Sequence, residues 1–183
     1  MPTTEVPALP TSPDIAPVTA HDRQEVSDLM SRFYGNARTM RDFTELTPES
    51  MEVIYTLAYN FYNAGKYDEA EKIFRFLANL DHFERKYWKG LGASREGLQK
   101  FAEALQVYGY LGMMDIHDPY PALQAAKCFI ALGKTAEAVS GLRAAAFNSE
   151  NRPEHAELHE QATAMLAVVQ EDAKSAPPAP ATA

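Results

Sequence analysis

The stretch WKGLGASREGLQKFAEALQVY, from Trp88 to Tyr108, carries small residues at positions that recur along the chain. They recur at one constant spacing with no insertions; the aligned residues are Leu57-Ala58, Leu91-Gly92 and Ala125-Ala126, and then Ala70, Ala104 and Ala138. The apolar residues around them follow the period of an α-helix. Small residues at such places let two helices approach closely, while the large ones fill the space between units. The chain therefore contains an internal repeat of paired helices.

The spacing and the order of small and large residues are those of the tetratricopeptide repeat, W-x₂-L-G-x₂-Y followed by A-x₃-F, with a period of about 34 residues. Three units lie one after another, at 51–84, 85–118 and 119–152. The second unit matches best, with Trp88, Leu91-Gly92, Ala104 and Tyr108 in place, and the third is the most degenerate. We predict an all-α fold in which three tetratricopeptide repeats form a right-handed α-solenoid.

Segments on both sides of the repeats complete the predicted organisation. Residues 21–46 carry a narrow apolar seam, which predicts an N-terminal helical segment. Residues 153–172 read as a helix with Pro153 near its start, and a solenoid needs such a helix to cover its last apolar surface. The two ends, 1–20 and 173–183, are rich in proline and small residues, so we expect disordered tails there.

The first helix of the first repeat has two apolar faces. Thr47 and Pro48 predict its start, as an N-cap followed by a proline at the first helical position. At 100° per residue, Tyr55, Tyr59 and Tyr62 occupy a stripe about 60° wide. The second face holds the core positions of the repeat, and we assign it to the solenoid core; its residues are Ile54, Leu57, Ala58 and Phe61.

The three tyrosines occupy positions 5, 9 and 12 of their unit, which in tetratricopeptide folds point into the concave groove. Tyrosine suits a binding wall because it offers a large contact area, little side-chain entropy to lose and a hydroxyl that can bond a peptide backbone. The alternative is that the tyrosines pack against an N-terminal helix at 23–43. Taken over all three units, the predicted groove consists of Tyr55, Tyr59, Tyr62, Lys89, Ala93, Glu96, Leu123, Lys127 and Ile130.

The sequence also resembles a specific family. The stretch IYTLAYNFYNAGKYDEAEKIFRFLANLDHF, from Ile54 to Phe83, and the later MDIHDPYP are similar to the class II type III secretion chaperones, over about residues 47–150. The resemblance implies a cytoplasmic bacterial protein that holds two hydrophobic translocator proteins before secretion, with a short extended segment in the groove. It also implies that Tyr55, Tyr59 and Tyr62 are aromatic groove residues. A homodimer through the N-terminal region is implied as well, with Leu29, Met30 and Phe33 in the interface.

Composition limits the other functions. The chain has 183 residues, a net charge of −8 and a pI near 5.1, which argues against a protein that binds the phosphate backbone of nucleic acids. The N-terminus lacks the basic and apolar regions of a signal peptide, and no apolar run is long enough to cross a membrane, so we expect a cytoplasmic protein without direct membrane insertion. The single cysteine, Cys128, excludes an intramolecular disulfide, and we expect it to be a packing residue.

A catalytic function finds little support. The chain has no glycine-rich phosphate loop, no nucleophile motif and no clustered carboxylates beyond solvated helix faces. His155 and His159 are spaced to share a metal, but no cysteine or third histidine stands nearby, so we read them as two exposed histidines. We expect no enzyme activity, metal or cofactor.

Another peptide-binding module is the main alternative. A co-chaperone that clamps the C-terminal carboxylate of a heat-shock protein needs lysine and asparagine on the inner faces of the first helices. Tyr55 and Tyr59 stand there in the first unit, and Gly90 and Ala93 in the second. Lys89 and Lys127 alone do not make that clamp, so an acidic C-terminal peptide should bind poorly. A generic repeat scaffold with a different partner remains open. Our prediction is a non-enzymatic chaperone that binds its partner in the groove.

Overall fold

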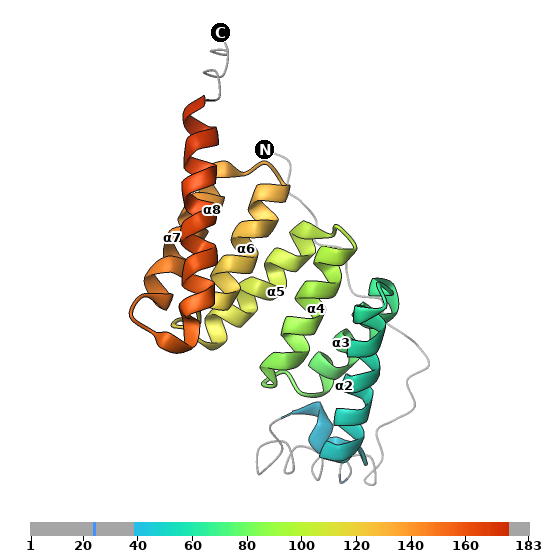
Figure 1. Cartoon of the computed structure of the whole chain (residues 1–183). Helices are drawn as coiled ribbons and strands as arrows, with labels where there is room; N and C mark the ends of the chain where they lie inside the picture. Colours follow the sequence, from blue (N-terminus) through green and yellow to red (C-terminus); the bar gives the residue numbers. More distant parts are fainter. Residues whose placement is uncertain (1–23, 25–38, 176–183) are drawn as a thin grey trace, which may run out of the picture. The chain divides into compact units, whose positions relative to one another are not determined.

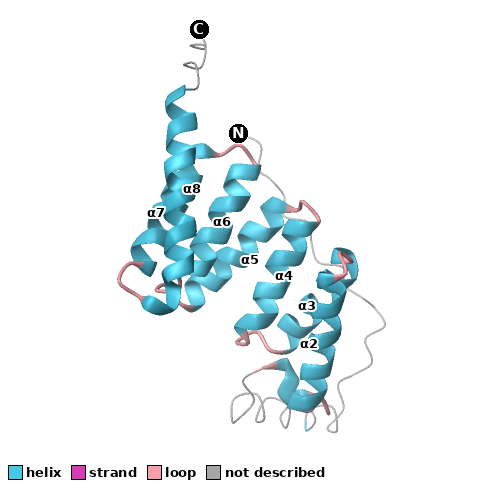
Figure 2. Cartoon of the chain, in the orientation of Figure 1, coloured by secondary structure: helices cyan, strands magenta, loops and turns pink. Residues whose placement is uncertain are grey.

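A computed structural model of the protein describes Gln24 and residues 39–175. The predicted N-terminal segment lies largely outside these residues, and so do Leu29, Met30 and Phe33. Over the described range the chain forms helices and no strands (Figures 1 and 2). The elements are η1 (Met40–Phe43), α2 (Pro48–Asn63), α3 (Tyr67–Leu80), α4 (Arg85–Gly97), α5 (Phe101–Met114), α6 (Pro119–Ala131), α7 (Thr135–Ser149), η2 (Pro153–His155) and α8 (Ala156–Ser175).

The helices from α2 to α7 form three successive hairpins, and each helix packs mainly against its neighbours along the chain (Figure 1). α8 continues this order by packing chiefly on α7, with a smaller contact to α6. Contacts between neighbours in sequence are what define a solenoid. The predicted all-α helical-repeat solenoid is therefore confirmed.

The first helix of each hairpin begins and ends in the same way. The side chains of Thr47, Glu84 and Asp118 accept hydrogen bonds from backbone N–H groups of the first turn of α2, α4 and α6. After these helices the chain turns through a left-handed residue, at Gly65 (φ +73°) and Gly133 (φ +70°). The equivalent residue of the second unit is Gln99, with φ +59°, a conformation that glycine adopts at lower cost.

The stretches LDHF (Leu80–Phe83) and MDIH (Met114–His117) form the loops between the hairpins, and the aspartate of each makes the same two kinds of contact. Asp81 Oδ1 accepts a hydrogen bond from the N–H of Phe83 at 3.2 Å, and Asp115 Oδ1 does the same for His117 at 3.0 Å. The other carboxylate oxygen of each aspartate accepts from an arginine, at 2.9 Å from Arg41 to Asp81 and at 3.1 Å from Arg85 to Asp115. Each aspartate thus closes a turn and ties it to a preceding element.

The core falls into two clusters. The larger joins α2 to α5 and reaches Cys128 on α6, with Phe74, Leu77, Tyr108 and Leu111 among its largest side chains. The smaller joins α6, α7 and α8, and its buried members are Leu123, Ala126, Leu142, Ala145 and Ala162. The first cluster is rich in aromatic residues, whereas the second is built from leucine and alanine.

One core prediction is wrong. Ala58 is fully buried, and Ile54 and Phe61 pack against the larger cluster, but Leu57 is 48% exposed. The equivalent Leu91 is only 2% exposed because the first hairpin precedes it. Within residues 39–175 no α-helix precedes α2, so Leu57 has no neighbour of that kind in this range.

Candidate functional site: an aromatic pocket between the first helices

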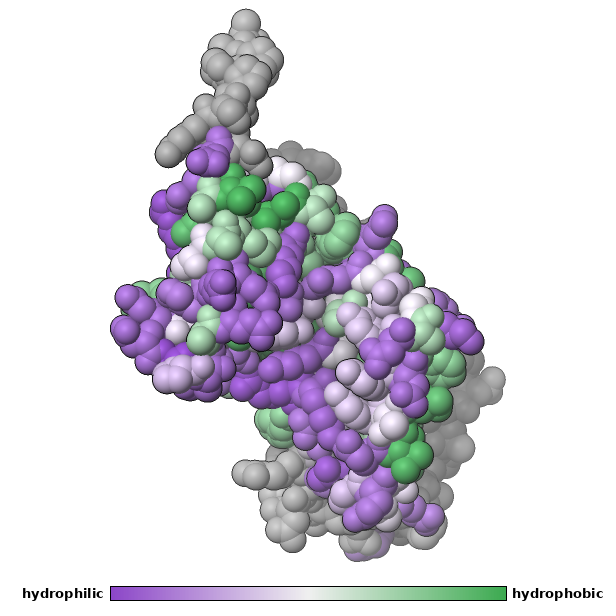
Figure 3. Space-filling view, viewed as in Figure 1, coloured by the Kyte–Doolittle hydropathy of each residue, from purple (hydrophilic) through white to green (hydrophobic). Residues whose placement is uncertain are grey.

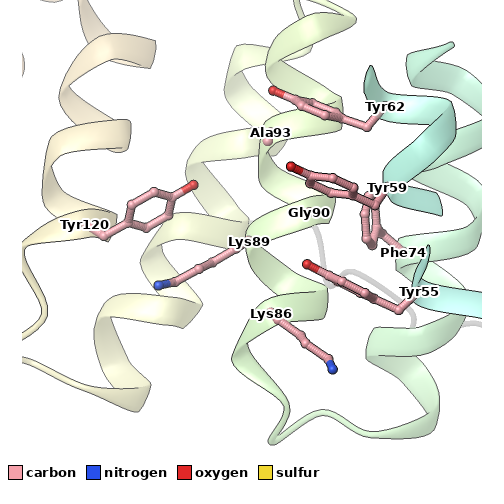
Figure 4. A pocket seen from close by; sticks show the side chains of 9 residues that line it. All are labelled: Tyr55, Tyr59, Tyr62, Phe74, Lys86, Lys89, Gly90, Ala93 and Tyr120. Atoms are coloured by element: carbon pink, nitrogen blue, oxygen red, sulfur yellow. The ribbon is translucent and has the colours of Figure 1, made fainter. Parts of the chain in front are cut away.

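A pocket of about 260 Å³ lies between the first helices of the three hairpins (Figure 4). Three tyrosines project into it from α2, a mixed wall comes from α4, and one further tyrosine comes from α6. The lining residues are Tyr55, Tyr59, Tyr62, Phe74, Lys86, Lys89, Gly90, Ala93 and Tyr120. In the space-filling view, residues of intermediate hydropathy gather over α2 and α4 beside strongly hydrophilic ones (Figure 3).

The three tyrosines of α2 differ in how firmly they are held. Tyr55 stacks on Tyr59 with ring centroids 6.4 Å apart, and meets Phe74 edge-on at 5.7 Å. Tyr62 meets Tyr67 edge-on at 5.4 Å. Tyr55 and Tyr62 are half-buried against the larger core cluster, whereas Tyr59 is 49% exposed. Tyr55 and Tyr62 therefore serve the core and the pocket together, and Tyr59 serves the pocket alone.

The hydroxyls of Tyr55, Tyr62 and Tyr120 stay protonated at neutral pH and can donate hydrogen bonds. Burial raises the pKa of Tyr55 and of Tyr62 above the ordinary value of 10.0. On the opposite wall, burial raises the pKa of Tyr120 to about 12. Figure 4 shows the hydroxyls of Tyr55, Tyr59 and Tyr62 pointing from α2 toward the space between the helices. The pocket thus combines apolar rings with protonated phenols.

Two lysines of α4 lie over aromatic faces of the pocket. The ammonium of Lys86 is 4.7 Å from the centre of the Tyr55 ring, and that of Lys89 is 4.6 Å from the Tyr120 ring. Such cation–π contacts hold the charge close to an apolar surface. A hydrogen bond from Lys86 to the carboxylate of Glu52 raises the pKa of Lys86. Lys86 is therefore firmly positively charged.

Five of the predicted groove residues line this one pocket, namely Tyr55, Tyr59, Tyr62, Lys89 and Ala93. Four further residues line it but were absent from the prediction, namely Phe74, Lys86, Gly90 and Tyr120. Lys86 and Tyr120 occupy the second position of their units, three residues before the fifth position and on the same helical face. That spacing could have identified them. Phe74 comes from the second helix of its hairpin, and its place at the pocket depends on packing.

Glu96, another predicted groove residue, does not line the pocket but lies partly buried next to it. Its neighbours are the hydroxyl of Tyr108 and the thiol of Cys128, and Lys127 attracts its charge. Burial raises the pKa of Glu96 above its ordinary value of 4.5. Burial also raises the pKa of Cys128 to about 12, so this thiol is protonated and packs in the core, as predicted.

Leu123 is a correction to the prediction. It occupies the fifth position of the third unit, as Tyr55 and Lys89 do in theirs, yet it is completely buried in the smaller core cluster. Ala162 of α8 belongs to the same cluster, so the C-terminal helix covers the face of α6 that was expected to be open. Ile130, further along α6, is 38% exposed but does not line the pocket.

Of the two histidines near the C-terminus, His159 contacts residues of α7. Nδ1 of His159 is 3.2 Å from the hydroxyl oxygen of Ser149 and 3.1 Å from the carbonyl oxygen of Ala146. Both His155 and His159 are half-buried, which corrects the expectation that they are exposed. Across Gln24 and residues 39–175, no three His, Cys, Asp or Glu side chains gather to hold a metal ion. None of the helices in this range is long and apolar enough to cross a membrane.

The alternative position for the tyrosines, against a helix at 23–43, falls largely on residues outside the described range. Within that range, Tyr55 and Tyr62 pack on the larger core cluster and on the first helices. Tyr59 is half exposed to solvent.

The chain is similar to known proteins over most of its length. A tetratricopeptide-repeat family model matches residues 51–82. Low calcium response locus protein H of Yersinia pseudotuberculosis is 35% identical over 148 residues, which cover 81% of this chain and 88% of that protein. PcrH of Pseudomonas aeruginosa, solved with the chaperone-binding region of PopD, is 40% identical with a TM-score of 0.67, over 70% of this chain and 97% of PcrH. The type III secretion chaperone SycD of Yersinia enterocolitica, solved with a peptide of the translocator YopD, is 36% identical with a TM-score of 0.66, over 71% of this chain and 99% of SycD.

Proposed function

The chain belongs to the family of class II type III secretion translocator chaperones, and from this premise we propose that it binds an extended segment of a hydrophobic translocator protein in the aromatic pocket. The observation that carries the proposal is the row of Tyr55, Tyr59 and Tyr62 along a pocket that remains open between α2, α4 and α6. A half-exposed tyrosine such as Tyr59 adds little to the core, whereas it can cover an apolar side chain of a partner.

The chemistry of the pocket fits a short extended segment. An apolar side chain can lie between the tyrosine rings, and the phenol hydroxyls can donate to backbone carbonyl groups that an extended chain leaves unpaired. A volume of about 260 Å³ admits a few side chains, so the pocket recognises a segment and not a folded domain. The related proteins SycD and PcrH were solved with a peptide of YopD and with the chaperone-binding region of PopD, respectively.

Binding of this kind gives a holding function without catalysis. The chaperone keeps two hydrophobic translocators soluble and apart in the bacterial cytoplasm until they are secreted. We assign binding to Tyr55, Tyr59, Tyr62, Lys89 and Ala93, extend the site to Lys86 and Tyr120, and place Glu96 and Lys127 at its border. We also keep the division into repeats at 51–84, 85–118 and 119–152, and a homodimer of the free chaperone through Leu29, Met30 and Phe33.

Co-expression with the hydrophobic translocators of the same bacterium tests the function. The full chain should yield a soluble stoichiometric complex with a translocator. If the translocator stays insoluble or unbound, the chain is a scaffold for another partner and the proposal is wrong.

Substitution of the tyrosines tests the site. Tyr59→Ala combined with Tyr62→Ala should weaken translocator binding by roughly tenfold or more, because aromatic residues at the centre of an interface contribute about 1–2 kcal/mol or more each. Phe76→Ala on α3 is the matched control, since Phe76 is 47% exposed, nearly as much as Tyr59, but does not line the pocket. Circular dichroism should show unchanged helical content in both variants. A double tyrosine variant that unfolds, or that binds as the control does, contradicts the site assignment.

A further inference from the structure

Every polar side-chain group that lines the pocket can donate a hydrogen bond. Of the nine residues that line it, four are tyrosines and two are lysines, while Phe74, Gly90 and Ala93 have no polar side-chain atoms. No carboxylate or amide side chain is among these nine. Phenols and ammonium groups are hydrogen-bond donors, and an ammonium group cannot accept. The pocket therefore fits an occupant that supplies acceptors, and the two cations favour one with a negative charge.

The ammonium of Lys89 is available for such a charge. Among the described residues, the nearest carboxylate oxygen is Oδ2 of Asp118 at 3.8 Å, and Arg85 forms an ion pair with that same oxygen. The other oxygen of Asp118 accepts from the N–H of Tyr120 at 2.9 Å. Asp118 is thus already used to cap α6 and to bind Arg85. Within the described residues Lys89 donates no hydrogen bond, and besides this 3.8 Å ion pair its ammonium contacts only the Tyr120 ring, 4.6 Å from the ring centre.

Lys86 has a partner that is easily replaced. It forms an ion pair with Glu52, whose side chain is 57% exposed, and the Lys86 side chain is itself 36% exposed. Exposed ion pairs of this type contribute only about 0–1 kcal/mol. A carboxylate that enters the pocket, where apolar rings exclude water, can compete with Glu52 for Lys86.

The positions of the lysines determine where an acidic side chain would lie. Figure 4 shows Lys86 and Lys89 near the end of the tyrosine row at Tyr55, and Ala93 near the other end at Tyr62. Lys89 and Ala93 are one helical turn apart, a rise of about 6 Å. In an extended peptide, side chains two residues apart share a face and are separated by about 7 Å. An acidic residue and an apolar residue in an i, i+2 relation therefore match this wall.

We propose that the pocket selects an internal, extended segment in which an aspartate or glutamate stands two residues from an apolar anchor. The carboxylate lies between the ammonium groups of Lys86 and Lys89, and the anchor lies against Tyr59, Tyr62 and Ala93. Because the chain has a net charge of −8, its overall field does not attract an acidic segment. The preference for an acidic residue therefore comes from the short-range contacts of these two lysines. This inference rests on the proposed function and specifies the class of segment that the site takes.

Synthetic peptides that tile the hydrophobic translocators test the inference. Short overlapping peptides, acetylated and amidated so that no terminal carboxylate contributes, are titrated with the full chain by fluorescence anisotropy. The peptide that binds should contain the acidic residue two positions from an apolar one. Replacement of that acid by its amide, Glu→Gln or Asp→Asn, should weaken binding about tenfold, which is about 1.4 kcal/mol.

Protein variants show whether the lysines cause this preference. Lys89→Met keeps the aliphatic stem and removes the charge, so it should abolish the difference between the acidic peptide and its amide form. Lys86→Met should reduce the difference. Lys66→Met is the matched control, because Lys66 also lies over an aromatic ring, 5.7 Å from the centre of Phe61, but outside the pocket. This control should keep the full difference.

The outcomes separate the two proposals. If peptides bind but the amide form binds as tightly as the acid, or if the preference persists in Lys89→Met, the inference is wrong and the proposed function stands. If no translocator peptide binds the unaltered chain, both the proposed groove function and the inference fail. The peptide comparison uses the unaltered protein, so it holds even if a lysine variant fails to fold.

Discussion

The fifth position of each repeat has a different environment in the two halves of the solenoid. Tyr55 on α2 and Lys89 on α4 line an open pocket, whereas Leu123 on α6 is completely buried beneath α8. The three residues have the same place in the repeat and differ in the helices that pack around them. α8 covers this face of α6, whereas the corresponding faces of α2 and α4 line the open pocket. The repeat therefore determines the direction of a side chain, and the next helix determines whether it can meet a partner.

The helices of the second and third hairpins also pack against each other with side chains of different size. Gly92 faces the ring of Tyr108 in the second unit, where a Cβ on Gly92 would come within 2.7 Å of the ring. In the third unit the corresponding residues, Ala126 and Leu142, are both fully buried. The smaller side chain of Leu142 leaves room for alanine in place of glycine.

The largest effect should come from Leu123→Ala. Deleting a fully buried leucine removes its burial free energy and leaves a cavity, which typically lowers the free energy of unfolding by about 2–5 kcal/mol. Tyr59→Ala, at an open position of the groove, should cost less than about 1 kcal/mol. Chemical denaturation of both variants measures the contrast. Equal losses would mean that α8 does not cover Leu123 as described, or that Tyr59 is a core residue.

A smaller loss is expected for Gly92→Ala. The added methyl group would overlap the Tyr108 ring at a cost of about 1–3 kcal/mol, partly offset by the better helix propensity of alanine, so we expect a net loss of about 1–2 kcal/mol in denaturation experiments. Gly109→Ala is the matched control, because a Cβ at Gly109 would meet no atom within 4 Å and the helix gains about 0.5–1 kcal/mol.

The same pair permits a stricter test. Combining Gly92→Ala with Tyr108→Leu recreates the residue sizes of the third unit, so the double variant should lose less stability than the sum of the two single losses. Strict additivity in denaturation experiments would show that Gly92 and Tyr108 do not compensate each other in size.

The smallest effect at neutral pH should come from Glu96→Gln beside the pocket. Burial raises the folded pKa of Glu96, so the folded state binds its proton more tightly than the unfolded state does. The stability from this proton is fully present below the unfolded value of about 4.5 and is lost as the pH rises through the folded pKa. The glutamine variant should therefore gain stability relative to the unaltered protein between pH 4 and neutrality. Melting temperatures measured over this range check the sign, and a difference that does not change with pH would contradict it.

Much of the fold follows from the sequence because its signals are local. The constant spacing of the repeats, the small residues at the helix contacts and the glycines after the first helices all act within one hairpin or between adjacent ones. The placement of Tyr55, Tyr59 and Tyr62 on one face follows from the helical period in the same way. For these features the physics of a single repeat is sufficient.

The features that were missed depend on the ends of the array and on packing. The exposure of Leu57 and the burial of Leu123 both arise where a repeat lacks a neighbour of its own kind: within residues 39–175 no α-helix precedes α2, and α8 comes after α7. Phe74 reaches the pocket from the second helix of its hairpin, beside Gly90, where a side chain would overlap its ring. A repeat consensus averages over such positions and so cannot predict them.

Site-specific photocrosslinking tests most directly whether the open half of the solenoid holds the translocator. The photoreactive residue p-benzoylphenylalanine replaces Tyr59 in one variant and Phe76 in another, which are 49% and 47% exposed aromatic residues of the first hairpin. Each variant is co-expressed with a hydrophobic translocator and irradiated. We predict a covalent adduct with the translocator from position 59 and little or none from position 76. An adduct of equal or greater yield from position 76 would contradict the account, because the partner would then lie on a face other than the aromatic pocket.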